Sequence, residues 1–141
     1  PLLRAGLAFT GLNANAPLLG EIDTDNDGVL TAMEVLNLDL AGTQLVVLSA
    51  CETGLGEIHE GEGVYGLRRS FQEAGVSNVV NSFWEVSDAG TQLLMTKFYA
   101  KFLGGMPARE AMREARLEML ETLEWSAPYY WSAFVLVGRN S

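Results

Sequence analysis

The sequence predicts an α/β fold in which a mostly parallel sheet is flanked by helices. Short, fully apolar runs alternate with longer segments whose apolar residues recur every three or four positions, as in buried strands and amphipathic helices. Glycines stand at the boundaries of these segments, where tight turns are needed. The chain has 141 residues, of which 48% are hydrophobic and 19% charged, so we expect one globular domain with a substantial core.

The composition excludes several classes of partner. The formal net charge is −9, and no lysine or arginine cluster offsets it, so neither nucleic acid nor an anionic membrane is expected to bind. A basic peptide or a cation is a more natural ligand. No apolar run approaches the roughly 18 residues of a membrane span, and we expect no signal peptide. One cysteine cannot form an internal disulfide, which favours the reducing cytoplasm. Because the chain starts at Pro1, we expect a fragment or a processed piece.

The first part of the chain contains a short apolar run at 6–9, which we expect to be a strand, and then a loop. Residues 23–34 match the calcium-binding loop of helix–loop–helix proteins position by position. Carboxylates fall at loop positions 1, 3 and 5, glycine at 6 and glutamate at 12. The candidate calcium ligands are Asp23, Asp25, Asp27, the carbonyl of Val29, Thr31 and Glu34.

A metal-free interpretation of the same loop stays open. Thr31 followed three residues later by Glu34 is also a capping box, which can start a helix without any ion. The incoming helix of a true pair is weak, since the segment before the loop contains Pro17 and Gly20. The loop is therefore either a calcium site or an acidic loop with a capped helix behind it.

Residues 43–50 predict a buried strand that ends next to Cys51, the only cysteine of the chain. In open α/β sheets, binding and chemistry gather beyond the carboxyl ends of the strands. A lone thiol at that position is a candidate nucleophile. The alternative is a buried cysteine that behaves as a small hydrophobic residue.

The glycines of segment 61–66 spell G-x-G-x-x-G, the dinucleotide fingerprint, and we reject that interpretation. They do not directly follow the strand, and Glu62 would lie where a pyrophosphate must approach. The segment instead leads into a helix over 64–74 whose apolar stripe would cover the sheet. Gly75 would end that helix.

The next strand is expected over 76–84. A right-handed crossover between the two strands would bring the Cys51 loop and the loop at 84–88 to one edge of the sheet. Asp88 also precedes a helix, so an N-cap role is an alternative to a role in the site.

The remaining chain predicts helices over 89–103 and 107–123 and a last buried strand over 131–138. Methionines in the helices are expected to fill the core. Glutamates interleave with Arg109, Arg113 and Arg116 on the second helix, which predicts an ordinary solvated face.

Several stretches closely resemble the CHAT domain, a family of caspase-like cysteine peptidases that is related to separase and often fused to tetratricopeptide repeats. They read LVVLSACETGLG (45–56), EGVYGLRRSF (62–71), NSFWEVSD (81–88), FY (98–99) and YYWSAFVLVG (129–138). The resemblance implies a caspase–hemoglobinase fold in a bacterial, cytoplasmic protein. Residues 1–141 would form the C-terminal part of the domain, with the EF-hand-like loop as an insertion at 23–34. It also implies that Cys51 is the nucleophile, with an oxyanion hole of nearby backbone N–H groups.

The family's general base is a histidine in an Ala-Thr-His-Gly-like motif, which this chain lacks. Its only histidine, His59, lies on a variable loop, where an exposed residue is the simpler interpretation. We expect the base on an upstream segment of the same peptidase domain and an isolated chain without activity.

The resemblance to separase further implies an acidic S1 residue that holds a basic side chain of a protein substrate. Asp88 is the first candidate and Glu85 the second. The expected function is a cysteine endopeptidase that cleaves after arginine or lysine, with no catalytic cofactor and with calcium as a regulator. The alternative is a non-catalytic, calcium-responsive interaction module on the same fold.

Overall fold

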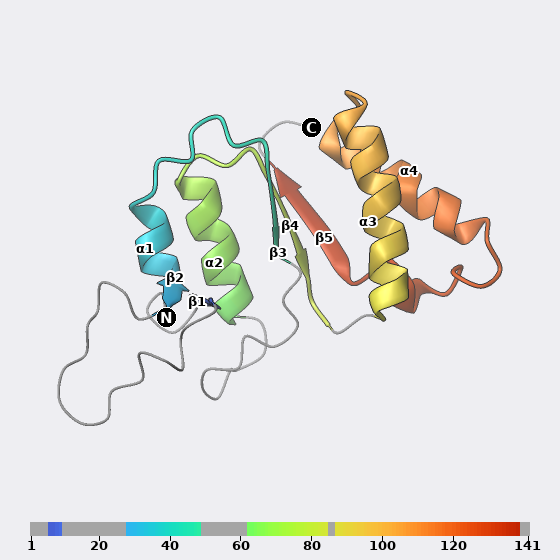
Figure 1. Ribbon diagram of the computed structural model, residues 1–141, viewed down its shortest axis with the longest axis horizontal. Coiled ribbons are helices and arrows are strands. Elements are labelled where there is room, and N and C mark those ends of the chain that lie inside the picture. The colour runs from blue at the N-terminus through green and yellow to red at the C-terminus, as the bar shows by residue number, and fades with distance from the viewer. Residues whose placement is uncertain (1–5, 10–27, 49–61, 85–86, 139–141) are drawn as a thin grey trace. The chain divides into compact units, whose positions relative to one another are not determined.

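The computed structural model describes residues 6–9, 28–48, 62–84 and 87–138, and it has the expected α/β architecture (Figure 1). The chain divides into two compact units. The first draws on Pro1–Gly42 and Thr53–Gly75, the second on Thr43–Glu52 and Val76–Ser141. In chain order the elements are β1 (Gly6–Ala8), β2 (Val29–Thr31), α1 (Ala32–Leu36), β3 (Leu45–Leu48), α2 (Glu62–Glu73), β4 (Asn78–Ser82), α3 (Asp88–Leu103), α4 (Ala108–Leu120), the 3-10 turn Pro128–Tyr130, and β5 (Phe134–Gly138).

The first unit contains a two-stranded antiparallel ribbon. β1 pairs with β2, and Leu7 lies opposite Leu30. The strand at 6–9 was expected from its apolar run. β2 was not predicted, because three residues are too short to show an alternating pattern.

α1 and α2 pack against each other in the same unit. Val35 of α1 is fully buried, and Leu67 and Phe71 form the buried stripe of α2. Their spacing of four residues places them on one helix face, as the sequence predicted. Behind α2, the Leu40 N–H donates to the Ala74 carbonyl at 2.9 Å.

Gly75 ends α2 in the left-handed conformation, with φ of +111°. A Cβ atom at this position would lie 2.9 Å from the backbone nitrogen of Ala41. Conformation and close contact both require glycine here, which confirms the expected helix end.

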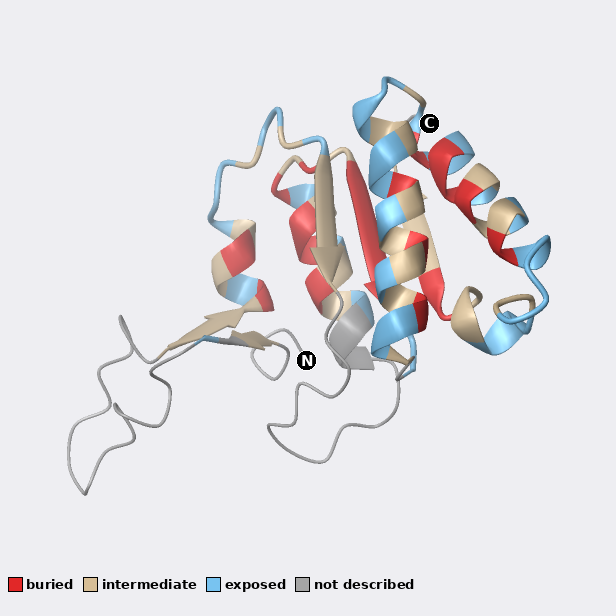
Figure 2. Cartoon of the chain, turned by 45° about the vertical axis from the view of Figure 1, so that its right-hand side comes forward, coloured by how far each residue is buried: buried red, intermediate tan, exposed pale blue. Residues whose placement is uncertain are grey.

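The second unit is built on the sheet β3-β4-β5. β3 and β4 run parallel with Val46 opposite Val79, whereas β4 and β5 run antiparallel with Val80 opposite Leu136. The expected parallel arrangement therefore holds for one of these two pairs. The reason is connectivity: two helices separate β4 from β5, and the second returns the chain to the end of the sheet where β4 stopped. All five residues of the central strand β4 are buried (Figure 2).

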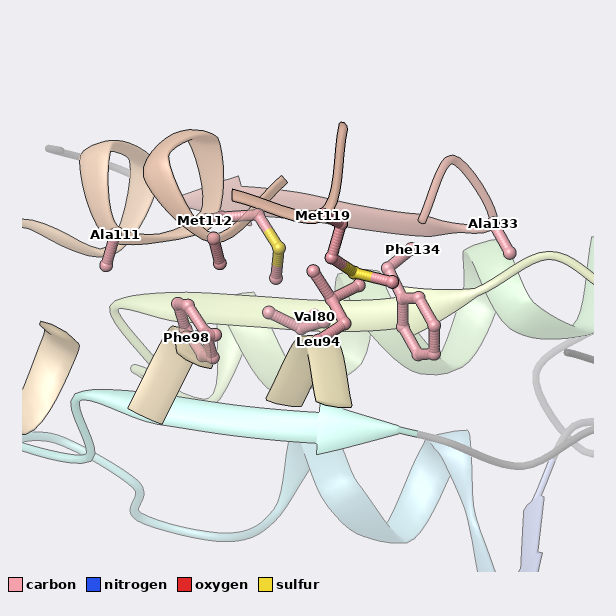
Figure 3. Close-up of a cluster of buried hydrophobic side chains, with 9 residues drawn as sticks. Val80, Leu94, Phe98, Ala111, Met112, Met119, Ala133 and Phe134 are labelled. Atoms are coloured by element: carbon pink, nitrogen blue, oxygen red, sulfur yellow. The ribbon is translucent and has the colours of Figure 1, made fainter. Parts of the chain in front are cut away.

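The core of this unit lies where α3 and α4 meet the sheet (Figure 3). The rings of Phe98 and Phe102 stack at 5.7 Å, and Phe98 is fully buried. Met112 and Met119 fill space in this cluster, as expected for an unbranched, adaptable side chain. The buried cluster consists of Val80, Leu94, Phe98, Ala111, Met112, Ala115, Met119, Ala133 and Phe134.

Glu118 joins α4 to α3 at the surface. Its carboxylate accepts from the Lys97 Nζ at 2.7 Å and from the Lys101 Nζ at 2.5 Å. These two charge-assisted hydrogen bonds, from Lys101 first and then from Lys97, lower the pKa of Glu118 to about 2.

Two predicted boundaries lie three residues from those in the structure. α4 ends at Leu120, not at residue 123. Leu123 is 95% exposed, so another helical turn would bury little apolar surface. β5 starts at Phe134, not at 131, because Trp131 and Ser132 donate their N–H groups back to the Pro128 carbonyl. No helix of the described segments is long and apolar enough to cross a membrane.

Candidate functional site

The parallel pairing of β3 and β4 places the carboxyl ends of both strands at the same end of the sheet. Leu48, the last residue of β3, lies opposite Asn81 near the end of β4. The chain therefore leaves both strands on the same side, toward Cys51 after β3 and toward Asp88 after β4. Cys51, Glu85 and His59 themselves lie outside the described residues.

Asp88 is the first residue of α3 and is exposed. The N-cap is Ser87, whose Oγ accepts from the Gly90 N–H at 3.2 Å. Ser87 therefore makes the side-chain cap, and the capping role considered for Asp88 is wrong by one position. The Asp88 carboxylate makes no hydrogen bond or ion pair with another residue of the described segments. It lies in the first turn of α3, where the helix dipole favours a negative charge.

Two buried polar side chains lie at the same end of β4. Asn81 is 1% exposed and Ser82 is 6% exposed. Neither the amide of Asn81 nor the Ser82 hydroxyl has a hydrogen-bond partner among the described residues. Burying such groups costs free energy, so they are unusual in a strand that is otherwise a core element. The sequence pattern predicted Asn81 and Ser82 only as strand residues, although two adjacent polar residues at the end of a strand are a visible signal.

The described part of the acidic loop contains a glycine with positive φ, a short strand and the start of a helix. Gly28, at loop position 6, has φ of +79°. Residues Val29–Thr31 are extended, and α1 begins at the next residue. The Phe9 N–H donates to the Gly28 carbonyl at 2.8 Å, so by the alternation of antiparallel pairing the Val29 carbonyl points away from β1. Position 7 of a calcium loop supplies this kind of carbonyl ligand.

The capping box considered for this loop is present. The Glu34 Oε2 accepts from the Thr31 N–H at 2.7 Å and from the Thr31 Oγ1 at 2.8 Å. The Glu34 N–H donates to the Thr31 Oγ1 at 3.2 Å. The bond from the Thr31 backbone, followed by the bond from its side chain, lowers the pKa of Glu34. A calcium ion bound through both carboxylate oxygens of Glu34 would compete with these bonds.

The metal prediction is not decided by this geometry. Asp23, Asp25 and Asp27 lie outside the described residues. Within the part of the chain that the structure describes, no three histidine, cysteine or acidic side chains gather closely enough to hold a metal ion. Calcium binding stays a prediction.

Comparison of the sequence with known proteins identifies one family and two related proteins. The sequence profile of the CHAT domain matches residues 1–139. Tetratricopeptide repeat protein 28 of Homo sapiens is 34% identical over 112 residues, and its Mus musculus counterpart is 32% identical over 112 residues. Each match covers 79% of this chain but only 4% of the relative, so the chain spans a small part of these proteins. Two mammalian relatives give no support to the bacterial source that the resemblance suggested.

The match extends well beyond the nucleophile motif. It includes the acidic loop, both helices of the second unit and β5. The motif-based resemblance is therefore confirmed over nearly the whole sequence, and this chain belongs to the CHAT domain family.

Proposed function

We propose that this chain is the nucleophile-bearing part of a cysteine endopeptidase that cleaves proteins after arginine or lysine. The observation that carries the proposal is the parallel pairing of β3 and β4. Because of this pairing, the segment that leads to Cys51 and the segment that leads to Asp88 both start at the same end of the sheet. Chemistry in α/β sheets is typically located beyond the carboxyl ends of the strands. Membership of a family related to caspase-like cysteine peptidases supports the same reaction.

The proposed chemistry needs a thiolate and a base. An upstream histidine takes the Cys51 proton, because only a few per cent of an ordinary thiol is ionised at neutral pH. The sulfur attacks the scissile carbonyl, and backbone N–H groups stabilise the oxyanion. The leaving amine takes the proton from the imidazolium. Water then hydrolyses the thioester, releases the new carboxyl group and restores the thiol.

Asp88 is the proposed S1 carboxylate, with Glu85 as the second candidate. Asp88 is exposed at the start of α3 and its side chain does not cap the helix, which supports this role. A carboxylate that is not used by its own helix can bind an arginine or lysine side chain.

We also propose that calcium at the loop 23–34 regulates the peptidase. The positive φ of Gly28, the extended segment after it and the orientation of the Val29 carbonyl support a cation loop. The same observations favour the second candidate function, a calcium-responsive interaction module without catalysis. In either case the names of the two relatives support tetratricopeptide repeats on the same protein.

The test uses the intact protein and an affinity probe. A biotinylated peptide acyloxymethyl ketone with arginine at the reacting position should form a thioether with Cys51, located by peptide mass spectrometry. The same probe with glutamate at that position should react far more slowly. The Cys51→Ser variant is the control for reaction at other residues.

Two outcomes would contradict the peptidase. The first is equal labelling of Cys51 in native and urea-denatured protein, which would indicate an ordinary accessible thiol. The second is an unlabelled Cys51 at every calcium concentration. If calcium still altered the protein's binding to other proteins, that second outcome would favour the interaction module.

A further inference from the structure

A second candidate site lies between α4 and β5, entirely within the second unit. An open pocket of about 460 Å³ is lined there by Arg109, Arg113 and Arg116 and by the edge of β5. The three arginines recur at positions i, i+4 and i+7, so they share one face of α4. The apolar part of the lining includes Met112, Leu117, Leu120 and Trp131. We call this pocket and the adjoining edge of β5 the arginine groove.

The groove is positively charged in an acidic protein. None of its lining residues carries a carboxylate, whereas the chain has a net charge of −9. Among the described residues, the acidic partner of these arginines is Glu114, whose carboxylate lies 2.5 Å from the Arg113 guanidinium on the exposed surface. Exposed pairs of this kind contribute little stability and exchange readily for another carboxylate.

Arg116 departs from the solvated helix face that its sequence pattern predicted. It is partly buried, and its Nη2 donates to the Phe134 carbonyl at 2.5 Å. Its Nε is buried without a hydrogen-bond partner in the described structure. Burial lowers the pKa of Arg116. A partly buried guanidinium whose acceptor among the described residues is a neutral carbonyl would be stabilised by a carboxylate.

The edge of β5 adds directional hydrogen-bonding groups to the groove. Phe83 donates its N–H to the Ala133 carbonyl, so the register places the backbone groups of Phe134 and Leu136 on the side away from β4. The bond from Arg116 to the Phe134 carbonyl agrees with this direction. Among the described strands, β5 pairs only with β4.

We propose that the arginine groove binds an extended acidic segment of a partner protein, which adds to the outer edge of β5 as a strand. Alternate residues of a strand face the same side, so carboxylates at every second position would meet the arginines of α4. Charge complementarity selects this occupant. A second copy of β5 would bring another row of arginines to the same edge, and like charges there are unfavourable.

The test measures binding of a fluorescein-labelled peptide of about eight residues, within the usual range of strand lengths, in which glutamate alternates with valine. The intact protein carries Cys51→Ser, so cleavage cannot intervene and the outcome is independent of the proposed peptidase. Fluorescence anisotropy should show saturable binding. A peptide with lysine in place of glutamate should not bind. A peptide with N-methylated valines should bind weakly, because it cannot complete the strand hydrogen bonds.

Arg113→Glu and Arg69→Glu form a matched pair of variants. Both arginines are exposed, and each has one glutamate neighbour, Glu114 or Glu73. Arg113→Glu should weaken peptide binding by about tenfold, as expected for reversing one interface charge. Arg69→Glu makes the same change of net charge on α2 and should leave the affinity unchanged.

The proposal is overturned if the acidic peptide does not bind or if the two variants weaken binding equally. Undiminished binding of the N-methylated peptide would leave only a general anion site, without strand recognition. Concentration-dependent self-association that Arg113→Glu abolishes would identify a second copy of the protein as the occupant instead.

Discussion

Ser87 and Asp88 are adjacent residues with separate tasks at the start of α3. The Ser87 hydroxyl accepts a hydrogen bond from the Gly90 N–H, and there is little free space around Gly90. A Cβ atom on Gly90 would lie 3.0 Å from the Ser87 Oγ and 2.8 Å from the Tyr130 Cδ1. Asp88 has no part in this arrangement, so the two residues can be tested independently.

Asp88→Asn should abolish the preference for arginine without unfolding the protein. The amide keeps the size of the side chain but loses the charge that would hold a guanidinium. The labelling rate of Cys51 by the arginine probe should fall at least about tenfold, close to that of a probe with a neutral residue.

Ser87→Ala is the matched control. It removes the cap and should lower the free energy of unfolding by about 1 kcal/mol, measured by urea denaturation, while the probe preference stays unchanged. If Ser87→Ala altered the preference as strongly as Asp88→Asn, Asp88 would be acting through the helix and not through the substrate.

Among the elements, α3 and α4 are joined by a buried apolar seam and by the ion pairs of Glu118. Each pair involves lysine side chains that are about a quarter exposed and a carboxylate that is 39% exposed. Solvent at that exposure screens much of the interaction. The seam therefore supplies most of the stability, and Glu118 provides a pH-dependent part of it.

Glu118→Gln should lower the free energy of unfolding by about 1 kcal/mol at neutral pH, a value reduced from the full pKa shift because of exposure. The folded pKa of about 2 lies below the ordinary value of 4.5. The contribution is therefore complete above the ordinary value and is lost as the pH falls toward the folded one.

Urea denaturation of both proteins at neutral pH and at about pH 3 measures this effect, and the difference between them should shrink in acid. Glu73→Gln, which breaks the exposed pair with Arg69, is the control and should change stability less. A difference that stays constant with pH would show that the ion pairs do not stabilise the helix pair.

The sequence predicted the elements that bury a regular stripe. α2 and α3 were placed within two residues because Leu67 and Phe71 or Leu94 and Phe98 repeat at helical spacing. The direction of β5 was not predictable, since an apolar run fixes a strand but not its partner or orientation. β2 depends on its pairing with β1, which is a tertiary contact.

The candidate site was predictable to a lesser extent. The motif around Cys51 identified the family, and the capping box was visible as Thr31 and Glu34. Ser87 and Asp88 are both good N-cap residues, so only the backbone geometry selects between them. The partial burial of Arg116 could not be predicted from the sequence, because β5 lies next to α4 only in the folded chain.

For the whole molecule, the loop proposed to bind calcium belongs to the first compact unit, and the chain around Cys51 at least up to Glu52 belongs to the second. Regulation by calcium therefore requires that binding in one unit alter reactivity in the other. Binding can do this only if calcium has different affinities for the reactive and unreactive forms. The effect must be measured on the intact protein.

Millimolar calcium should increase the labelling rate of Cys51 by the arginine probe, and Asp25→Asn should abolish that increase. Asp25 is not a member of the capping box, so this variant should keep its calcium-free melting temperature. An unchanged labelling rate in calcium, or no calcium binding by calorimetry, would contradict regulation at this loop.

Thr31→Val separates the capping function from the metal. It removes the hydroxyl that bonds with Glu34, so it should lower the calcium-free melting temperature. Because the pKa of Glu34 is lowered in the folded protein, its share of this stability is present above the ordinary glutamate pKa and is lost as the pH falls below it. The calcium-free melting temperature of Thr31→Val should therefore differ least from that of the unmodified protein in acid.

The position of β4 between its two partners has a consequence for synthesis of the protein. β3 precedes it in the chain, but β5 is translated only after both helices of the second unit. Until then, the ribosome carries a nascent chain whose most buried strand has one unpaired edge. Such an edge is prone to pair with other chains. The unpaired edge of β4 therefore needs protection by a chaperone most while α3 and α4 are being synthesised.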